Sequence, residues 1–503
     1  MEGAEDRIPL VVGVAQWTQR EVDLDRPPSP LEVLARVCRA AAEDTGVGDA
    51  LWRHVRTVAV VHLVSWRYTN LPRALAEKLG AKPERALYTT PGGNSGQWLV
   101  NRIAREIAGG KLDLALVGGV ELLRTVRKAL RESRPLAWET DSSSEPEIVG
   151  DPRPGTREEE VLYGARAPVQ IFPLFENALR AHYGLDMESH RQELGALCQG
   201  LSQVAARNPY AWFPKERSAE EISTVTAENR MISFPYPKFM NALLDVDQAA
   251  ALLLASASTA RKLGIPSSKW VYVRGVGDAD DHWFFTERRD YVSSPALRLA
   301  AERALETAGA SAADVGLFDL YSCFPCAVQI GRDMLGFSRA DARPWTVTGG
   351  LPYHGGPGSN YTTHAVATMV EKLRRGEAKW GLVSGLGWYF AKHSVGVYST
   401  DPPDEAPRFR NPDADRSELE RIPRPQFVRE AAGKARIETY TVVHDRQGLP
   451  AQAIVVGRTA DEKRFLANTP VDRKLFEELE RTEGVGRRGR VSHTGGKNVF
   501  VPE

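Results

Sequence analysis

Side chains that could perform chemistry gather at two places in the second half of this chain. Tyr321 ends a strand-like run, and Cys323 and Cys326 follow it with Cys-x-x-Cys spacing. Tyr353 and His354 stand just before a glycine-rich turn. A phenol or an imidazole at the end of a strand can act as an acid, a base or a hydrogen-bond donor. A redox role for the two thiols is conceivable, but no second pair and no thioredoxin pattern accompanies them, which favours buried, inert thiols.

Two glycine-rich turns organise the positions around these residues. Residues 91–96 read Pro-Gly-Gly-Asn-Ser-Gly and residues 355–360 read Gly-Gly-Pro-Gly-Ser-Asn, and each turn precedes a helix pattern and a short apolar strand. The offset that carries Asn94 onto Asn360 also aligns the glycines that end the two strands. The repeat predicts two similar halves that face each other, with a site at their junction that takes one turn from each half.

The periodicity of the flanking segments predicts an α/β layered fold with largely parallel strands. In the first half, strand patterns alternate with helix patterns at 10–14, 31–44, 58–62, 71–79 and 114–117. The second half repeats this order at 270–276, 296–307, 315–321 and 381–384. Residues 124–238 have no counterpart in the second half and contain an acidic, serine-rich stretch at 139–147 and two amphipathic helices. Such an insertion over a cleft is a usual place for ligand-binding elements.

The C-terminal part of the chain predicts a separate small module. Several prolines among charged residues between 402 and 425 predict an extended linker. Short strand patterns follow with one helix near 471–481, which is the element content of an OB-type barrel. The expected units are, in order, an N-terminal half (1–123 and 239–268), an inserted loop domain (124–238), a C-terminal half (269–400), the linker (401–429) and an OB-like domain (430–503).

Composition argues against several classes of function. The 503 residues include 65 Lys plus Arg and 65 Asp plus Glu, so no global field attracts nucleic acid or an anionic membrane. No apolar run approaches the ~18 residues that span a bilayer, and the polar N-terminus does not fit a signal peptide. The chain has 4 cysteines, which suits a reducing compartment. We therefore expect a cytoplasmic protein without a nucleic-acid or membrane partner.

The duplicated halves, the glycine turns and the insertion resemble the thiolase superfamily over about residues 8–400. The resemblance is closest to the sterol-carrier-protein-type thiolases and the thiolase-like proteins of type 1, which carry an extra C-terminal domain. Its most specific stretch is 382–398, Leu-Val-Ser-Gly-Leu-Gly-Trp-Tyr-Phe-Ala-Lys-His-Ser-Val-Gly-Val-Tyr. The resemblance implies a βαβαβαββ unit used twice in an αβαβα arrangement, with a coenzyme A thioester over the junction.

The resemblance also implies where the reactive groups of a thiolase would stand. The nucleophilic cysteine position falls on Gly93, and the histidine of the Gly-His-Pro motif falls on Gly356. The Asn/His-Glu/Asp-x-Phe motif falls on residues 321–324, and the late Cys-x-Gly motif falls on residues 384–386. Because glycine cannot attack a thioester, ordinary thiolase activity is not expected, although the backbone of each motif is retained.

The leading interpretation is therefore an acetyl-CoA acetyltransferase-type scaffold, an acyltransferase by resemblance, with a link to lipid metabolism. It would recognise coenzyme A or an acyl-CoA as a ligand, without a covalent intermediate and without a tightly bound cofactor or metal. We expect Lys238 near phosphate. The remaining ligand contacts are expected from Asn241, Gly93, Asn94 and Gly356.

Two other functions stay open. A C–C lyase could cleave a β-hydroxyacyl-CoA with Tyr321 or His354 as the base and Tyr353 as a further candidate, as in thiolase-like aldolases that work with an OB-fold partner. A non-catalytic scaffold could use the C-terminal module as a docking surface. Thiolases usually dimerise through strands near the nucleophile turn. Here the C-terminal module could fold over that surface, so a monomer and a homodimer are both expected possibilities.

Overall fold

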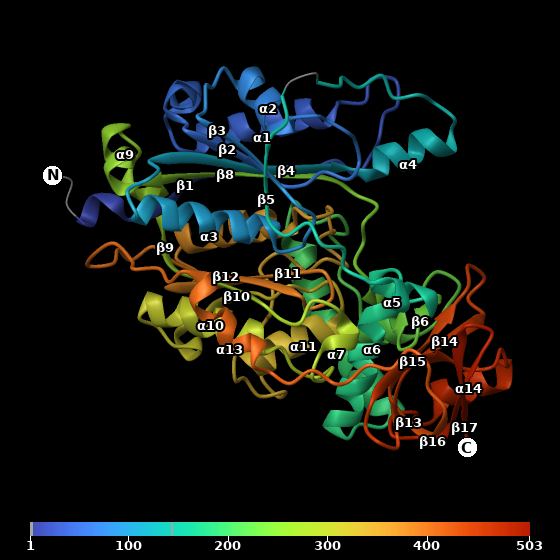
Figure 1. Ribbon diagram of the computed structural model, residues 1–503. Helices are drawn as coiled ribbons and strands as arrows, with labels where there is room; N and C mark the ends of the chain where they lie inside the picture. The colour runs from blue at the N-terminus through green and yellow to red at the C-terminus, as the bar shows by residue number, and fades with distance from the viewer. Residues whose placement is uncertain (1–3, 142–143) are drawn as a thin grey trace.

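The computed structural model describes residues 4–141 and 144–503, and Figure 1 shows its helix and sheet layers stacked alternately. Helices α3 (Ser95–Ala108) and α12 (Tyr361–Arg374) form the middle layer between the sheets of two similar halves. Helices α1 (Pro30–Asp44) and α2 (Leu71–Leu79) cover the first sheet, and α10 (Pro295–Ala308) covers the second. The predicted αβαβα thiolase-like fold is confirmed.

The first half follows the expected βαβαβαββ order. Its strands are β1 (Pro9–Thr18), β2 (Thr57–Val60), β3 (Arg85–Thr89), β4 (Leu114–Leu122) and β8 (Asp247–Ser256). Local chemistry fixes the helix ends: Ser29 forms a capping box with Glu32 at the start of α1, and Gly80 ends α2 at φ 75°. Strand β3 was not predicted, because its five residues alternate too briefly between buried and half-buried positions.

The second half has no counterpart of β3 among the described residues. Its elements are β9 (Val271–Asp280), α10, β10 (Leu317–Asp319), α11 (Pro325–Met334), α12, β11 (Trp380–Gly387) and β12 (Lys392–Ser399). The offset that carries Asn94 onto Asn360 would place such a strand at 351–355, but residues 341–355 contain none. The buried carboxylate of Asp319 instead accepts hydrogen bonds from the amides of Val347 (3.0 Å) and Thr348 (3.2 Å). These bonds satisfy backbone donors that a strand ladder would otherwise satisfy.

The two half-sheets join edge to edge through β1 and β9, where Leu10 pairs with Tyr272. The strand order is β10-β11-β12-β9-β1-β8-β4-β2-β3-β5. The last strand, β5 (Glu147–Val149), was not predicted and lies at the end of the acidic stretch, two residues of which (142–143) fall outside the described ranges. It pairs in parallel with β3, so the backbone edge beside the first glycine turn is covered by a segment of the insertion.

The two glycine turns meet reciprocally at the junction of the halves. A Cβ atom added to Gly385 would lie 2.8 Å from the Cα of Asn94. A Cβ added to Gly119 would lie 3.0 Å from the Cβ of Asn360, and closer still to its amide group. Each asparagine therefore packs on the glycine of the other half. This exchange is what an approximate two-fold arrangement of duplicated halves requires, and it explains why both glycines lack a side chain.

The insertion and the C-terminal domain form one continuous structure. The insertion contains α4 (Leu123–Arg131), β5, α5 (Glu158–Leu162), α6 (Pro168–Tyr183), α7 (Met187–Arg207), α8 (Ala219–Ser223), β6 (Met231–Ser233) and β7 (Tyr236–Pro237). The C-terminal domain contains β13 (Gly433–His444), β14 (Pro450–Thr459), β15 (Arg464–Asn468), α14 (Arg473–Arg481), β16 (Arg488–Thr494) and β17 (Lys497–Pro502). The order β14-β15-β17-β16-β13 closes by pairing of β14 with β13, which confirms the predicted OB-like barrel. Strand β13 also pairs with β6 of the insertion.

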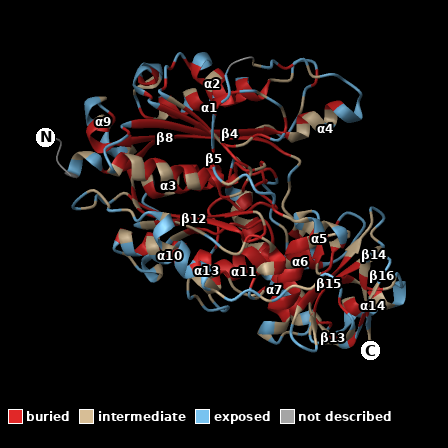
Figure 2. Cartoon of the chain, in the orientation of Figure 1, coloured by how far each residue is buried: buried red, intermediate tan, exposed pale blue. Residues whose placement is uncertain are grey.

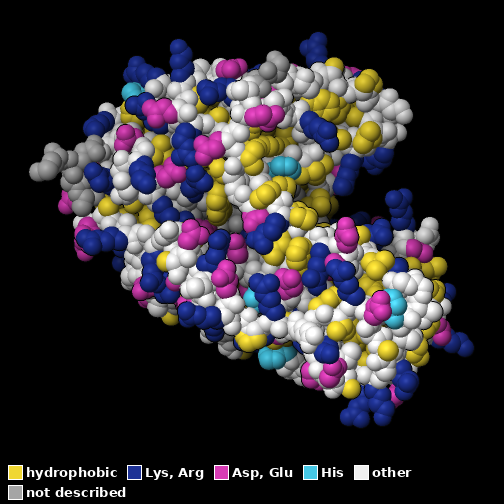
Figure 3. All heavy atoms as spheres, viewed as in Figure 1, with side chains coloured by type: hydrophobic (Ala, Val, Ile, Leu, Met, Phe, Trp, Pro, Cys, Tyr) yellow, Lys and Arg dark blue, Asp and Glu magenta, His cyan; other side chains and the backbone are white. Residues whose placement is uncertain are grey.

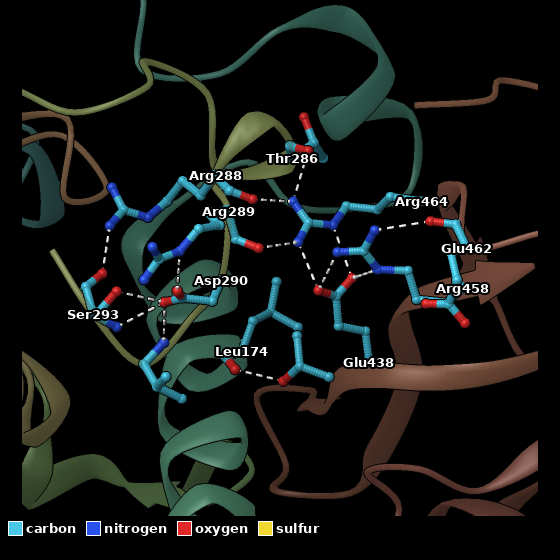
Figure 4. A network of polar contacts seen from close by, with 12 residues as sticks. Leu174, Thr286, Arg288, Arg289, Asp290, Ser293, Glu438, Arg458, Glu462 and Arg464 are labelled. Carbon is cyan, nitrogen blue, oxygen red and sulfur yellow. Dashed lines mark hydrogen bonds and ion pairs between the residues drawn. The ribbon is translucent and has the colours of Figure 1, made fainter. Parts of the chain in front are cut away.

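Arg464 fastens the barrel to the second half (Figure 4). Its side chain is 0% exposed and donates to both carboxylate oxygens of Glu438, at 2.8 and 2.6 Å. It also donates to the backbone carbonyls of Thr286 (3.0 Å) and Arg289 (3.4 Å). The sequence had allowed the barrel to cover the edge of β3. Because the barrel is anchored here and on the insertion, it does not do so. The nearby strand β5 covers that edge instead.

The linker is fastened along its length. Residues 410–424, which we call the strap, contain η7 (Pro412–Asp415) and α13 (Arg416–Glu420). Asp415 pairs with Arg303 of α10 at 3.0 Å, and the carbonyl of Arg410 accepts from Arg105 of α3 at 3.1 Å. The strap therefore crosses the outside of β9 and forms one wall of the cavity discussed below.

Burial follows the layers. Both sheets are red almost throughout in Figure 2, and pale blue residues lie mainly on outer helices and loops. Across the part of the chain that the structure describes, no helix combines the length and apolar character needed to cross a membrane.

Candidate functional site

Tyr321 fills the space beside Gly93 at the junction of the two halves. A Cβ added to Gly93 would lie 2.5 Å from the Cζ of Tyr321, closer still to its hydroxyl, and 2.5 Å from the carbonyl oxygen of Leu386. These separations are far below an ordinary van der Waals contact. Space, rather than an unusual backbone conformation, therefore requires glycine at this position.

The surroundings of Tyr321 make its hydroxyl a neutral hydrogen-bond donor. The residue is 7% exposed, and its ring meets Tyr361 edge-on at 5.6 Å between centroids. Its amide donates to the Ser384 hydroxyl at 3.0 Å, which gives the serine of the late motif a structural role. Burial, with a smaller contribution from Cys323, raises the pKa of Tyr321 well above its usual value. A phenolate base at neutral pH is therefore disfavoured, whereas donation by the neutral phenol is available.

Gly356 has more room than Gly93. A Cβ added there would lie 3.3 Å from Leu351 and 3.4 Å from the carbonyl oxygen of Leu243. The Gly356 amide donates to the same carbonyl at 2.8 Å. The space directly around this position could accept a small side chain with minor adjustment, so packing at the Cβ does not by itself explain the loss of the histidine.

The structure separates Tyr353 from the other two candidate side chains. The hydroxyl of Tyr353 faces the Cys198 thiol of α7 and has no hydrogen-bond partner within the described ranges. The His354 ring instead contacts Tyr361 (5.8 Å) and His364 (5.2 Å). Burial lowers the pKa of His354 to about 4, so its imidazole is neutral at pH 7. Its Nε2 atom is also without a partner among the residues described.

The expected ligand-binding residues occupy different environments. Asn94 stands at the start of α3, where its Nδ2 donates to Ser394 at 3.1 Å and its Oδ1 has no partner in the described structure. Lys238 is exposed. Asn241 is half-buried and donates to the Pro237 carbonyl at 2.7 Å. The next residue donates to the Cys323 carbonyl at 3.1 Å, so this segment reaches the junction.

The cysteines are not poised for nucleophilic chemistry. All four described thiols are free and buried. Burial raises the pKa of Cys323 and of Cys326 far above the usual range, and the Cys326 thiol lies 3.6 Å from the Phe172 carbonyl. Inert thiols, as favoured by the sequence, agree with this environment.

Lys392 was not among the site residues predicted from the sequence. It begins β12, is 8% exposed, and its ammonium donates to the Pro91 carbonyl at 2.8 Å, at the start of the first glycine turn. A Cβ added to Gly92 would lie 2.7 Å from its Nζ. The available signal was a lone lysine within the largely apolar 382–398 stretch. Its amine therefore lies beside the first glycine turn.

A basic hollow beside α4 was also missed. It has a volume of about 670 Å³, and α4 forms one edge of the notch between the upper and lower lobes in Figure 3. Its charged lining is Arg20, Glu21, Arg124, Lys128, Arg131 and Glu132. Cations outnumber carboxylates, so the hollow favours anions. The spacing of basic residues along 124–131 was the signal that could have revealed it.

Comparison with known proteins agrees with this geometry. The family described as "Thiolase-like protein type 1 additional C-terminal domain" matches residues 416–496. The crystal structure of a monomeric SCP2-thiolase like protein type 1 from Mycobacterium smegmatis is 35% identical, with 99% of each chain covered and a TM-score of 0.85. The fold and the double glycine turn define a thiolase-like protein. The chain belongs to the SCP2-thiolase-like protein type 1 family, so the predicted resemblance is confirmed.

More distant relatives share parts of this scaffold. The acetyl-CoA acetyltransferase of Methanocaldococcus jannaschii is 25% identical over 272 residues, which cover 54% of this chain and 62% of the relative. The chain spans between 40% and 62% of the length of the curated relatives it matches. The Ltp2-ChsH2(DUF35) aldolase shares the fold, with 17% identity, a TM-score of 0.60, and coverage of 78% of this chain and 98% of that chain.

Proposed function

We propose that this protein binds a coenzyme A thioester at the junction of its two halves without forming an acyl-enzyme. One observation carries the proposal: the Tyr321 ring and hydroxyl occupy the space that a nucleophilic side chain at residue 93 would need. The backbone of both turns is retained, including the start of α3 at Ser95. A scaffold that keeps both turns but whose nucleophile position is filled can bind a thioester without covalent catalysis.

The charges and donors suggest how such a ligand would lie. The basic hollow beside α4 fits the phosphate groups, with Arg131 and Lys128 as contacts and the exposed Lys238 as a further one. The thioester end would reach the junction, where the neutral Tyr321 hydroxyl can donate to the carbonyl oxygen. The Asn241 side chain holds an oxygen without a partner in the described structure, and this oxygen can accept a hydrogen bond from the ligand.

Calorimetry with coenzyme A and acetyl-CoA tests this directly. We expect binding to the wild type, and a loss of about 1 kcal/mol or more in Arg131→Gln, because a charge-assisted phosphate contact is removed. Lys82→Gln, at an exposed position outside the hollow, is the matched control and should bind like the wild type. The absence of heat at millimolar ligand with the wild type would contradict the proposal and favour the non-catalytic scaffold.

The C–C lyase remains a second candidate because the Tyr321 hydroxyl lies at the junction beside Gly93 and is a neutral donor. With its pKa raised, this phenol would stabilise an enolate rather than remove a proton, which changes the role expected from the sequence. If a β-hydroxyacyl-CoA is cleaved, Tyr321→Phe should lower turnover by roughly 100-fold and leave coenzyme A affinity nearly unchanged. Full activity of this variant would remove Tyr321 from the mechanism.

We also propose that the protein is a monomer. Strand β5 occupies the backbone edge of β3 that would otherwise be free to pair with a second copy. A relative that is 35% identical is described as monomeric. Sedimentation equilibrium should give the mass of one chain, 55.5 kDa, and a dimer at micromolar concentration would contradict this.

A further inference from the structure

A second cavity, of about 460 Å³, lies beneath the strap. Its walls come from the end of β3, the first turn of α3, the segment after β5, the paired strands β9 and β12, and η7 with α13 of the strap. The residues at the centre of the proposed thioester site, Gly93, Tyr321 and Gly356, do not line it. The basic hollow beside α4 shares no residue with it either. The proposed function therefore leaves this cavity unexplained.

Lys392 is the reactive group in the wall of this cavity. Among the described residues its side chain makes one hydrogen bond, to the Pro91 carbonyl at 2.8 Å, so two of its ammonium protons have no partner there. Within the described ranges, no carboxylate oxygen comes within ion-pair distance of it. The rings of Trp283 and Trp388 lie 5.7 and 5.9 Å from its Nζ. A lysine that is only 8% exposed and lacks a paired carboxylate is unusual, because an unpaired buried charge is costly.

The surroundings of Lys392 favour a neutral amine. Burial, with a smaller contribution from the nearby Arg153, lowers the pKa of Lys392 to about 8, even though Asp280 and Asp151 partly oppose the shift. At pH 8 about half of such an amine is unprotonated, compared with roughly 0.4% for a lysine of ordinary pKa near 10.4. Only the unprotonated amine is a nucleophile, so burial increases its reactivity.

The other charges on the wall restrict the ligand. Carboxylates line the cavity at Asp151, Asp278, Asp280, Asp413 and Asp415. Among the described residues, Arg105 pairs with Asp278 at 2.6 Å, Arg153 with Asp151 at 2.7 Å and Arg303 with Asp415 at 3.0 Å. Asp280 and Asp413 then remain on the wall against Lys392 and Arg416, so the remaining charges are close to balanced. The wall therefore carries no excess of positive charge that would attract an anionic ligand such as a coenzyme A thioester. An uncharged molecule with an electrophilic carbon fits the cavity better.

Asn94 supplies a second polar group at the amine. It is 5% exposed, and its Oδ1 has no partner among the residues described. A Cβ added to Gly92 would lie 2.7 Å from the Lys392 Nζ and 2.8 Å from this Oδ1, so both atoms flank the same glycine. The oxygen can accept a hydrogen bond from a hydroxyl group formed when the amine adds to a carbonyl. Gly92 leaves this space open because it has no side chain.

We propose that the cavity beneath the strap binds an uncharged aldehyde or ketone, and that Lys392 forms an imine with it. The amine nitrogen bonds to the carbonyl carbon, and proton transfer gives a carbinolamine. Loss of its hydroxyl as water then forms the C=N bond. The step releases one water and requires no oxidant or reductant. The inference goes beyond the proposed thioester binding and does not depend on it.

Reductive trapping on the full-length chain tests the proposal. Butanal and benzaldehyde are incubated with the wild type, borohydride reduces any imine to a stable secondary amine, and peptide mass spectrometry locates the added mass. Lys82 and Lys111, both exposed, are the internal comparators. We expect Lys392 to be labelled at least about tenfold faster than either at pH 7.5, with a rate that rises to a plateau above pH 8. Labelling of Lys392 no faster than the comparators would overturn the proposal.

Two further arms separate this site from the thioester site. Lys392→Arg keeps the positive charge but removes the primary amine, so it should abolish the fast labelling phase. Saturating coenzyme A should leave the labelling rate of Lys392 unchanged, whether or not coenzyme A binds. Strong protection by coenzyme A would mean that the cavity belongs to the thioester site, and the separate carbonyl site would be refuted. Because the wild-type measurement stands alone, poor folding of Lys392→Arg would not prevent the test.

Discussion

A single methyl group at residue 93 should reveal how fully Tyr321 occupies the nucleophile position. In Gly93→Ala the new Cβ would lie 2.5 Å from the Tyr321 Cζ and 2.5 Å from the Leu386 carbonyl oxygen, so these atoms must move by about 1 Å. Tyr321 is 7% exposed and packs against Tyr361, and Leu386 contributes backbone from β11, so neither moves freely. Overpacking of this kind costs about 1–3 kcal/mol.

Urea denaturation of four chains would measure this cost and its origin: wild type, Gly93→Ala, Tyr321→Ala and the double variant. Removing the tyrosine ring relieves one of the two clashes, so the cost of Gly93→Ala should fall by about 1 kcal/mol or more in the Tyr321→Ala background. Gly356→Ala is the matched control, because its nearest neighbour would be 3.3 Å away. Equal costs for Gly93→Ala and Gly356→Ala, or no coupling to Tyr321, would refute the reasoning.

Three further outcomes follow from buried charges and thiols. Burial raises the pKa of Glu121 to about 7, so the folded chain holds a proton that the unfolded chain loses above about pH 4.3. The free energy of unfolding should therefore fall by up to about 3 kcal/mol from pH 4.5 to 7.5, and urea titration of Glu121→Gln should show a weaker dependence on pH. Arg464→Met should lower the free energy of unfolding by about 3–5 kcal/mol, and by more than Arg458→Met, because it removes a fully buried partner of Glu438. Equal melting temperatures for the two variants would contradict the anchoring role of Arg464. Incubation with acetyl-CoA should leave no acetyl group on any cysteine by intact-mass analysis, because all four described thiols are buried and burial raises their pKa. An acetyl adduct on Cys323 would restore a transferase interpretation.

Local patterns were sufficient to predict most of the scaffold. An α/β layered fold, the insertion, the linker and the OB-like barrel follow from helix and strand periodicity and from glycine and proline positions, which act over a few residues. The αβαβα arrangement was implied by the family resemblance, and the expectation of largely parallel strands was wrong, because β1, β8, β9 and β12 pair antiparallel with their neighbours. The repeated offset between Asn94 and Asn360 also predicted two facing halves. The short strands β3 and β5 were not predicted, because three to five residues carry too little periodicity. Strand β5 also depends on its pairing with β3, which a local pattern does not show.

The sequence by itself determined that a cysteine is absent at residue 93 and a histidine at residue 356, because residue identity decides which side chains can react. Only the tertiary structure decided what occupies that space. Tyr321 reaches Gly93 across the junction, and Lys392 reaches the first glycine turn from a strand of the other half. Burial then changes their proton affinities in opposite directions, since it disfavours the charged form of both the phenol and the amine. Such contacts join residues hundreds of positions apart, so local pattern cannot specify them.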